Sequence, residues 1–226
     1  MGRSMALAVA RSGANVIVHF NISSSDAESL AIEIQDIGRQ VWLLQADIST
    51  EKGLSGLCEN AFALTPVNSL INNASIFHPG SFLETSLPSW QNHLHINLTS
   101  PFLLSHAFAR NLGNDSVGSI INLVDWRALR PGKDHFAYTI SKAALVAMTQ
   151  SLALSLAPNI SVNAMALGAI LPPENEKVDP KLLEKVPLKR WAELIELHSL
   201  LIYLLKRPLS LTGQVIHLDG GRHLLK

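Results

Sequence analysis

Apolar residues along the chain follow two patterns in turn, which predict alternating strands and helices. Continuous apolar runs rich in β-branched residues predict strands over 15–20, 41–45, 69–72, 117–124, 160–166 and 214–218. Apolar residues at helical spacing predict helices over 5–13, 25–37, 50–64, 88–112, 136–157 and 191–206, with a kink at Pro101. Residues 171–190 fit neither pattern and are expected to form an irregular, lid-like stretch.

The strand pattern also predicts the fold class. The predicted strands lack period-2 alternation, which is typical of a parallel sheet covered by helices on both faces. No internal repeat, low-complexity tract or linker is visible, so we expect residues 1–226 to form a single domain. The expected architecture is a three-layer α/β/α arrangement.

Composition narrows the classes of function. Hydrophobic residues make up 47% of the chain and charged residues 16%, which fits a well-buried sheet and argues against disorder. The formal net charge is zero, so nothing favours a nucleic-acid or anionic-membrane partner. We see no signal peptide and no apolar run long enough to cross a bilayer, and we expect a cytoplasmic protein. Cys58 is the only cysteine and the nine histidines form no metal pattern, so we expect neither disulfides nor a metal site.

The stretch from Asp125 to Lys142 carries the candidate chemistry. Tyr138 and Lys142 are four residues apart at the start of a predicted helix, so their side chains project from one face. A lysine ammonium close to a tyrosine favours the tyrosinate, and we expect Lys142 to lower the pKa of Tyr138. A tyrosine–lysine pair of this spacing is common on exposed helices, so the surrounding motifs must carry the argument.

Six short motifs in this order resemble those of the short-chain dehydrogenases/reductases, a Rossmann-type family, and the resemblance covers nearly all of the chain. The resemblance implies a doubly wound parallel sheet and an NAD(P)-dependent oxidoreductase. The matching motifs are Gly2 (the last glycine of the Gly-rich turn), Asp47 (the acid that contacts adenine), Asn72-Asn73-Ala74 (the NNAG motif, here with Ser75 in place of glycine), Asn97 (the helix asparagine of the catalytic set), Tyr138 with Lys142, and the closing segment LTGQVIHLDGG.

The family resemblance also implies roles for individual residues. Lys142 would bind the nicotinamide ribose, and Asn97 would hold a water molecule in the proton path. Gly168 would lie near the nicotinamide, although Leu167 stands where the family usually has proline. The helices predicted over 88–112 and 136–157 resemble the subunit-contact helices of the family, which implies a homodimer or homotetramer.

Within the family, the chain is most similar to pteridine reductases. Most members carry a serine about thirteen residues before the tyrosine, whereas this chain has Asp125, as pteridine reductases do. A carboxylate is a poor donor to a carbonyl oxygen but accepts hydrogen bonds from the amino group and ring N–H of a pterin. The sequence NNASIF also matches, which assigns Ser75 to the substrate site and Phe77 to stacking on the pterin ring. The alternatives are that Asp125 caps a turn and that Phe77 anchors a loop in the core.

The end of the first predicted strand favours NADP(H) over NAD(H). NAD-specific Rossmann sites place an acid there for the ribose 2′-hydroxyl, and this chain has none. A 2′-phosphate would meet no repulsion, and it could accept hydrogen bonds from His19, Asn21, Ser23 and Arg3. Ile22 stands near the position where pteridine reductases often have arginine.

The sequence begins at the end of the Gly-rich turn. A Rossmann domain starts with a strand and the turn that follows it, so about ten residues are expected to be absent. That strand is central in the doubly wound order, and we expect its absence to open the sheet and leave backbone groups unpaired. Either the true start lies upstream, or the chain is a repurposed relative.

These observations lead to one prediction and two alternatives. The prediction is NADPH-dependent reduction of a pterin or dihydrofolate, with Asp125 and Tyr138 holding the ring and arranging proton delivery. The first alternative is reduction of a ketone such as a 3-oxoacyl thioester, which the missing serine disfavours. The second is a non-catalytic remnant that acts as a binding or dimerisation module. We expect no nucleic-acid, membrane or metal partner.

Overall fold

The computed structural model describes the whole chain except residues 55, 114, 171–182, 209 and 226. All strand pairs are parallel, as predicted, and they form two sheets. One sheet has the order β1-β2 and the other the order β3-β4-β5-β6. The strands are β1 (Val16–Phe20), β2 (Val41–Gln45), β3 (Ser69–Asn72), β4 (Gly118–Asp125), β5 (Ile160–Leu167) and β6 (Val215–Leu218). The expected opening in the sheet is present. It separates β1 and β2 from the other four strands.

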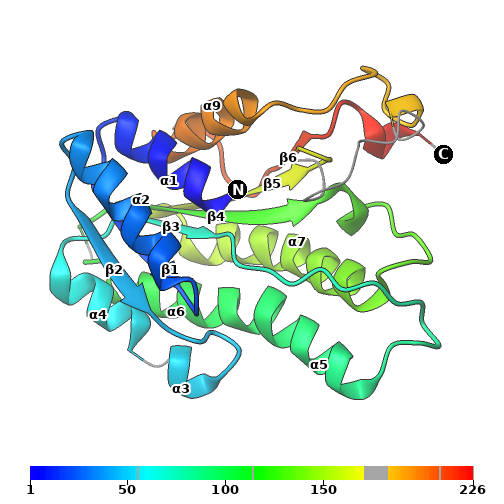
Figure 1. The fold of residues 1–226 in the computed structure, drawn as a ribbon, viewed down its shortest axis with the longest axis horizontal. Helices are drawn as coiled ribbons and strands as arrows, with labels where there is room; N and C mark the ends of the chain where they lie inside the picture. The colour runs from blue at the N-terminus through cyan, green and yellow to red at the C-terminus, as the bar shows by residue number, and fades with distance from the viewer. Residues whose placement is uncertain (55, 114, 171–182, 209, 226) are drawn as a thin grey trace.

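The helices alternate with the strands and cover both faces of the sheet (Figure 1). α1 and α9 lie on one side of the four-stranded sheet, and α6 and α7 lie on the other, which gives the expected three layers. The helices longer than one turn are α1 (Gly2–Arg11), α2 (Ser24–Asp36), α4 (Leu57–Leu64), α5 (Leu87–Leu94), α6 (Ser100–Asn111), α7 (Phe136–Leu156) and α9 (Leu194–Leu205). The short elements are α3 (Glu51–Leu54), the π-helix η1 (His95–Thr99) and the 3₁₀ helices η2 (Trp126–Ala128) and η3 (Arg222–Leu224).

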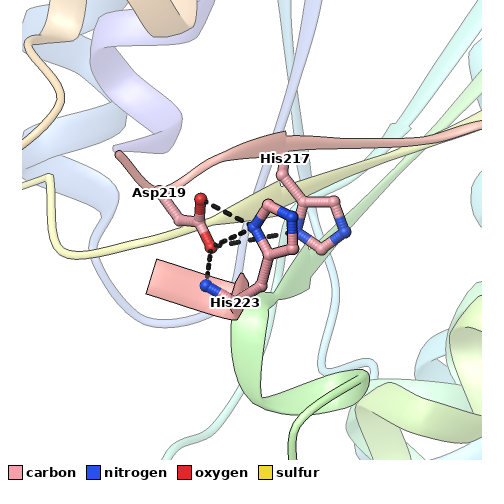
Figure 2. A group of neighbouring side chains, drawn as sticks. All are labelled: His217, Asp219 and His223. Atoms are coloured by element: carbon pink, nitrogen blue, oxygen red, sulfur yellow. Dashed lines mark hydrogen bonds and ion pairs between the residues drawn. The ribbon is translucent and has the colours of Figure 1, made fainter. Parts of the chain in front are cut away.

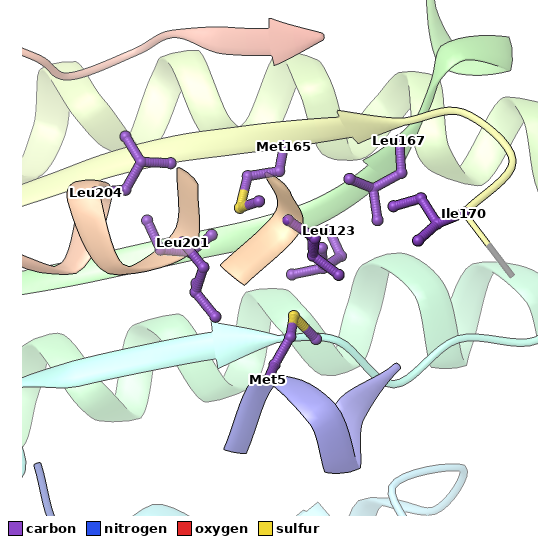
Figure 3. Close-up of a cluster of buried hydrophobic side chains, with 9 residues drawn as sticks. Met5, Leu123, Met165, Leu167, Ile170, Leu201 and Leu204 are labelled. Carbon is purple, nitrogen blue, oxygen red and sulfur yellow. The ribbon is translucent and has the colours of Figure 1, made fainter. Parts of the chain in front are cut away.

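The main core joins α1 and α9 to the four-stranded sheet (Figure 3). Met5 projects from α1, Leu123 and Met165 project from β4 and β5, and Leu201 and Leu204 pack from α9. These side chains are almost completely buried, so each contributes about 1.5–3 kcal/mol by removal from water. The first predicted helix is therefore held in place by the core of the larger sheet.

Two predicted helices are interrupted in the structure. The helix predicted over 50–64 is divided into α3 and α4, and Gly56 at the start of α4 adopts φ 79°, a left-handed conformation that favours glycine. The helix predicted over 88–112 changes at η1, where five residues form a π-helix, and not at Pro101. Pro101 lies in the first turn of α6, directly after η1.

The helix α7 corrects the expectation that no segment could cross a bilayer. Among the described residues it is the one helix long and apolar enough to do so by length and composition alone. Its buried face packs on the sheet, where Leu145 and Val146 contact Ala164 and Ala166 of β5. The same face carries buried polar groups such as Thr149 and Lys142, so the apolar residues of α7 serve the core.

Candidate active site

The carboxyl ends of the central strands bring the predicted residues to one edge of the sheet. β4 pairs with β5 along eight residues, and Asp125 at its end lies opposite Leu167. β3 pairs with β4 so that Asn72 lies opposite Asn122. Asn73, Asp125 and Gly168 therefore all leave the sheet at the edge where parallel α/β folds bind their ligands.

Asp125 joins this strand end to the tyrosine of α7. Its Oδ1 accepts a hydrogen bond from the Arg127 backbone N–H at 2.8 Å, and its Oδ2 accepts one from the Tyr138 hydroxyl at 3.3 Å. Asp125 therefore caps a turn, as the alternative reading held, and also contacts the candidate catalytic tyrosine. Burial raises the pKa of Asp125, against the smaller opposing effects of the Arg127 N–H and guanidinium.

The pKa of Tyr138 is shifted in the opposite direction to our expectation. Burial raises it, and the negative charge and hydrogen bond of Asp125 add to that effect. The predicted lowering by Lys142 is wrong because the side chain closest to the hydroxyl is a carboxylate. Tyr138 is therefore protonated at neutral pH and can donate a proton or a hydrogen bond.

Lys142 is buried beneath the tyrosine. Its Nζ donates a hydrogen bond to the Leu123 carbonyl at 2.8 Å and lies 5.8 Å from the centre of the Tyr138 ring. Burial lowers the pKa of Lys142 to about 8, although the charge of Asp125 opposes this shift. The ammonium keeps two further N–H donors, so the predicted role in holding a ribose is compatible with this position.

Asn97 is completely buried in η1, and its side chain fastens the loop after β3 to α7. Its Oδ1 accepts hydrogen bonds from the Ser75 hydroxyl and the Ile76 N–H, at 3.0 and 2.9 Å. Its Nδ2 donates to the Ile76 carbonyl and the Ser141 hydroxyl, both at 3.0 Å. These four bonds use the whole capacity of the amide, so the side chain has none left for the water that we predicted. Asn97 positions Ser75, and a direct catalytic role stays a prediction.

Phe77 forms an aromatic wall above the tyrosine. Its ring stacks on His135 at 4.0 Å between centroids and meets the Tyr138 ring edge-on at 4.6 Å. The Phe77 side chain is 50% exposed, which excludes the alternative of a core residue. His135 was not predicted, because this contact depends on a loop pairing in which the Phe136 N–H donates to the Gly80 carbonyl at 2.8 Å.

A cavity of about 400 Å³ lies where the cofactor prediction places the adenosine end. Its walls include the end of β1, the segment after β2 and the loop after β3, and its lining contains His19, Asn21, Asp47, Ala74 and Ser75 among other residues. A cavity of this size can accept a nucleoside. The described end of β1 carries no acid, so the residues present fit a cofactor with a 2′-phosphate.

Several predicted donors for that phosphate already have protein partners. The Arg3 guanidinium contacts α2 through the Asp26 carbonyl, the Ser29 hydroxyl and the Glu33 carboxylate. His19 Nε2 lies 2.9 Å from the Ala46 carbonyl. To bind the phosphate, the Arg3 guanidinium would have to give up its contacts with α2.

Two glycines mark close contacts at the site. A Cβ on Gly2 would lie 2.9 Å from Asn73 Nδ2, so the start of α1 approaches the NNAS segment closely. A Cβ on Gly168 would lie 2.7 Å from the Asp219 Cα, and the Gly168 N–H donates to the Leu218 carbonyl at 2.9 Å. Gly168 therefore allows the strand ends of β5 and β6 to meet beside the site. No acidic residue occupies the first turn of α1, which leaves its N–H groups suited to an anion.

The sequence analysis also did not predict the cationic side chains next to Asp125. Two guanidinium groups lie over the Trp126 ring, those of Arg127 at 5.0 Å and Arg222 at 4.3 Å from its centre. Arg127 also forms a salt bridge with Asp134 at 2.6 Å, and this hydrogen bond lowers the pKa of Asp134 to about 2. The residues come from η2, η3 and the loop before α7, and no sequence spacing links them.

Known proteins place the chain in a family. The family model described as enoyl-(acyl carrier protein) reductase matches residues 1–223. The chain is 31% identical to the 3-oxoacyl-[acyl-carrier-protein] reductase of Aquifex aeolicus, over 98% of this chain and 92% of that protein. The structure is similar to the crystal structure of the alternative dihydrofolate reductase 1, FolM, of Brucella suis in complex with NADP, with 34% identity, a TM-score of 0.92 and coverage of 100% of this chain and 91% of that one. It is also similar to the acetoin dehydrogenase of Enterobacter cloacae, with 30% identity, a TM-score of 0.91 and coverage of 100% and 92%. The chain belongs to the short-chain dehydrogenase/reductase family, and it is an α/β oxidoreductase of that family.

Proposed function

We propose that this protein is an NADPH-dependent reductase of dihydrofolate or a related pterin. The observation that carries the proposal is Asp125, a half-buried carboxylate in contact with Tyr138 where a carbonyl reductase needs a hydrogen-bond donor. The half-exposed Phe77 ring beside it offers a flat surface for a flat heterocycle. The similar FolM structure is of an alternative dihydrofolate reductase with NADP bound, which supports the same choice.

When bound, the cofactor supplies the hydride, and the side chains of this chain position the ring and manage protons. Asp125 has one oxygen held by the Arg127 N–H and the other facing Tyr138. That second oxygen would accept a ring N–H or amino hydrogen of the substrate. Because its pKa is raised by burial, Asp125 also takes up a proton more readily than an exposed carboxylate does.

Tyr138 would act as the proton donor, since its raised pKa keeps the hydroxyl protonated. Lys142 lies directly below the ring and would hold the ribose of the cofactor with its remaining N–H groups. The 400 Å³ cavity between β1, β2 and the NNAS loop would hold the adenosine, and His19, Asn21 and Ser23 lie at the end of β1 where a 2′-phosphate would bind.

The experiment compares substrates on one enzyme. The wild type is expected to oxidise NADPH with dihydrofolate or a dihydropterin and to turn over acetoacetyl thioester much more slowly. Asp125→Ala is expected to reduce kcat/KM for the pterin by about 10²-fold or more, since a buried, oriented hydrogen bond is removed. Asp125→Ser is the matched variant, because it restores the donor of a carbonyl reductase and should gain thioester activity. Unchanged pterin turnover in Asp125→Ala would refute the role.

A second candidate is reduction of 3-oxoacyl thioesters. The relative from Aquifex aeolicus is named for that activity and is 31% identical. The chemistry of the Asp125 carboxylate argues against it, as a carboxylate repels the oxyanion that forms from a ketone. Preference of the wild type for the thioester in the same assay would establish this candidate instead.

The third candidate is a non-catalytic module. An NADPH titration followed by nicotinamide fluorescence separates it from both reductases, because each reductase must bind the cofactor saturably. We expect a dissociation constant on the order of micromolar. Absence of binding to a folded chain would favour the module. A homodimer or homotetramer built on α5, α6 and α7, and a cytoplasmic location, stay predictions.

A further inference from the structure

The C-terminal segment brings together three potential metal ligands outside the catalytic set (Figure 2). His217 projects from β6, Asp219 follows the end of that strand, and His223 lies in η3. One ligand atom of each residue lies within 4.8 Å of the other two. The nine histidines showed no metal pattern in the sequence, because the spacing His-x-Asp-x₃-His becomes a cluster only when the chain turns at Gly220 and Gly221.

The separations suit a small cation. Asp219 Oδ2 lies 2.9 Å from His223 Nδ1 and 3.9 Å from His217 Nδ1. A tetrahedral ion about 2 Å from each ligand holds its ligands roughly 3–3.5 Å apart, a value that these two distances bracket. The two imidazole rings are stacked, with centroids 3.7 Å apart and planes 21° apart, so their Nδ1 atoms lie on the same side as the carboxylate.

One ligand is held in place by hydrogen bonds, and another makes no hydrogen bond. Asp219 is 5% exposed, and its carboxylate accepts the backbone N–H groups of Gly221 and His223 at 2.9 and 2.8 Å. Such supporting hydrogen bonds orient metal-binding carboxylates. His217 Nδ1 is buried and makes no hydrogen bond. A buried nitrogen without a partner is costly, so its position facing a carboxylate calls for an explanation.

We propose that His217, Asp219 and His223 form a binding site for one divalent first-row transition cation, for which Zn²⁺ is the natural probe. Two imidazoles and one carboxylate are ligands typical of such ions, and three protein ligands leave a position for water. On binding, the ion takes the place of the hydrogen bond between His223 Nδ1 and Asp219, and the proton on Nδ1 passes to Nε2 or to solvent, so that Nδ1 binds the ion through its lone pair. The backbone hydrogen bonds to Asp219 are retained.

The surroundings set limits on the affinity. A cavity of about 220 Å³ opens beside the three residues and gives an ion access from solvent. Arg190 lines this cavity, but its guanidinium is neutralised by Glu196 through hydrogen bonds at 2.7 and 2.8 Å. Arg222 lies in the same turn, and Arg130 donates to the His223 carbonyl at 3.3 Å, so both oppose a cation.

The site is connected to the active-site edge through its backbone. Asp219 packs against Gly168, and Arg222 of the same turn stacks on Trp126, next to Asp125. An ion would therefore fasten the C-terminal turn to β6 at the border of the substrate site. The proposal does not depend on the identity of the substrate.

The test uses the full chain without a histidine tag, stripped of metal with a chelator. Zn²⁺ is titrated in competition with a chromophoric chelator, and the melting temperature is followed in parallel. We expect one Zn²⁺ per chain and a rise in melting temperature, since an ion that binds only the folded state stabilises it. His217→Ala and His223→Ala should each weaken Zn²⁺ binding by at least about tenfold.

Two variants separate ligation from folding. His217→Ala removes a nitrogen that makes no hydrogen bond, so circular dichroism of the metal-free variant should match the wild type. His106→Ala, on the remote helix α6, is the matched control and should leave Zn²⁺ affinity unchanged. Wild-type protein that binds no Zn²⁺ at tens of micromolar, or His217→Ala protein that binds as tightly as wild type, would overturn the proposal.

Discussion

The central strands of the larger sheet, β4 and β5, are far more deeply buried than β1 and β2, whose burial is similar to that of the edge strands β3 and β6. In β4, the seven residues from Gly118 to Val124 are all buried, and β5 is buried along nearly its whole length. In β1 no residue is fully buried, and the same holds for β2. The four-stranded sheet is covered by helices on both faces, whereas β1 and β2 pair with each other and lean on α2 and the end of α1.

This difference in burial coincides with a difference in the predicted roles of the residues. Asp125 and Lys142, whose positions matter to within fractions of an ångström, are supported by the well-packed sheet and α7. His19 and Asn21, predicted to hold the adenosine end, belong to the half-exposed pair of strands. Elements with few buried apolar contacts open locally at low free energy, so the cofactor end should gain order from its ligand, and the catalytic end should not need it.

The largest effect is expected at the catalytic end. Tyr138→Phe removes the proposed proton donor, and kcat should fall by about 10²–10⁴-fold. NADPH affinity should change little, because the Lys142 bond to the Leu123 carbonyl does not involve the hydroxyl. Steady-state kinetics combined with an NADPH titration measure both quantities. A variant with nearly normal kcat would show that another group delivers the proton.

A pair of core substitutions tests the comparison in terms of stability. Ile121→Ala in β4 empties a completely buried site and should lower the free energy of unfolding by about 2–5 kcal/mol. Val18→Ala in β1 removes a half-buried side chain, and should cost under about 2 kcal/mol. Urea unfolding followed by circular dichroism measures both. Equal losses at the two positions would mean that β1 is as well packed as β4, contrary to our interpretation.

These contrasts also explain how far the sequence could predict the structure. Continuous apolar runs such as 117–124 and 160–166 identified the buried strands, since both faces of a parallel strand must be apolar. The Tyr138–Lys142 spacing and the NNAS segment indicated one edge of the sheet as the candidate site, and the structure brings these residues together there, because parallel strands end at the same edge. Local pattern was sufficient wherever a residue's role follows from its own element.

Sequence patterns did not predict the role of a residue where that role depends on segments far away in the chain. The four hydrogen bonds of Asn97 join η1, the NNAS loop and α7, so its full use could not be foreseen. The raised pKa of Tyr138 depends on how deeply it is buried next to Asp125, and the tyrosine–lysine spacing alone indicated the wrong sign. The stacking of Phe77 on His135 required the fold of two loops.

Stability should depend on pH through Lys142. Its pKa is lowered by burial from the ordinary 10.5 to about 8. Between about pH 8 and pH 10 the folded chain has lost this proton and the unfolded chain retains it, so the free energy of unfolding should rise with pH. The full effect is roughly 3 kcal/mol. Tyr138 acts in the opposite sense above pH 10, because its raised pKa makes the unfolded chain lose its proton first.

Lys142→Met isolates this contribution, because it keeps a similar volume without the titrating group. As the pH rises from 7.5 to 10, the free energy of unfolding of the wild type should rise relative to that of the variant. Lys133→Met, in the loop before α7, is the control and should show no such trend. A difference that is constant with pH would place the pKa of Lys142 near its ordinary value.

The last prediction concerns the two-stranded sheet itself. Saturating NADPH, at about 100 times its dissociation constant, should stabilise the folded chain by roughly 2.7 kcal/mol. Hydrogen exchange should show this protection mainly at the backbone amides of the end of β1, of the segment after β2 and of the NNAS loop, which border the 400 Å³ cavity. Amides of β4 and β5 should change little, since the packing of these strands already protects them. Equal protection throughout both sheets would mean that they open together as one unit, and that the difference in burial does not translate into a difference in local stability.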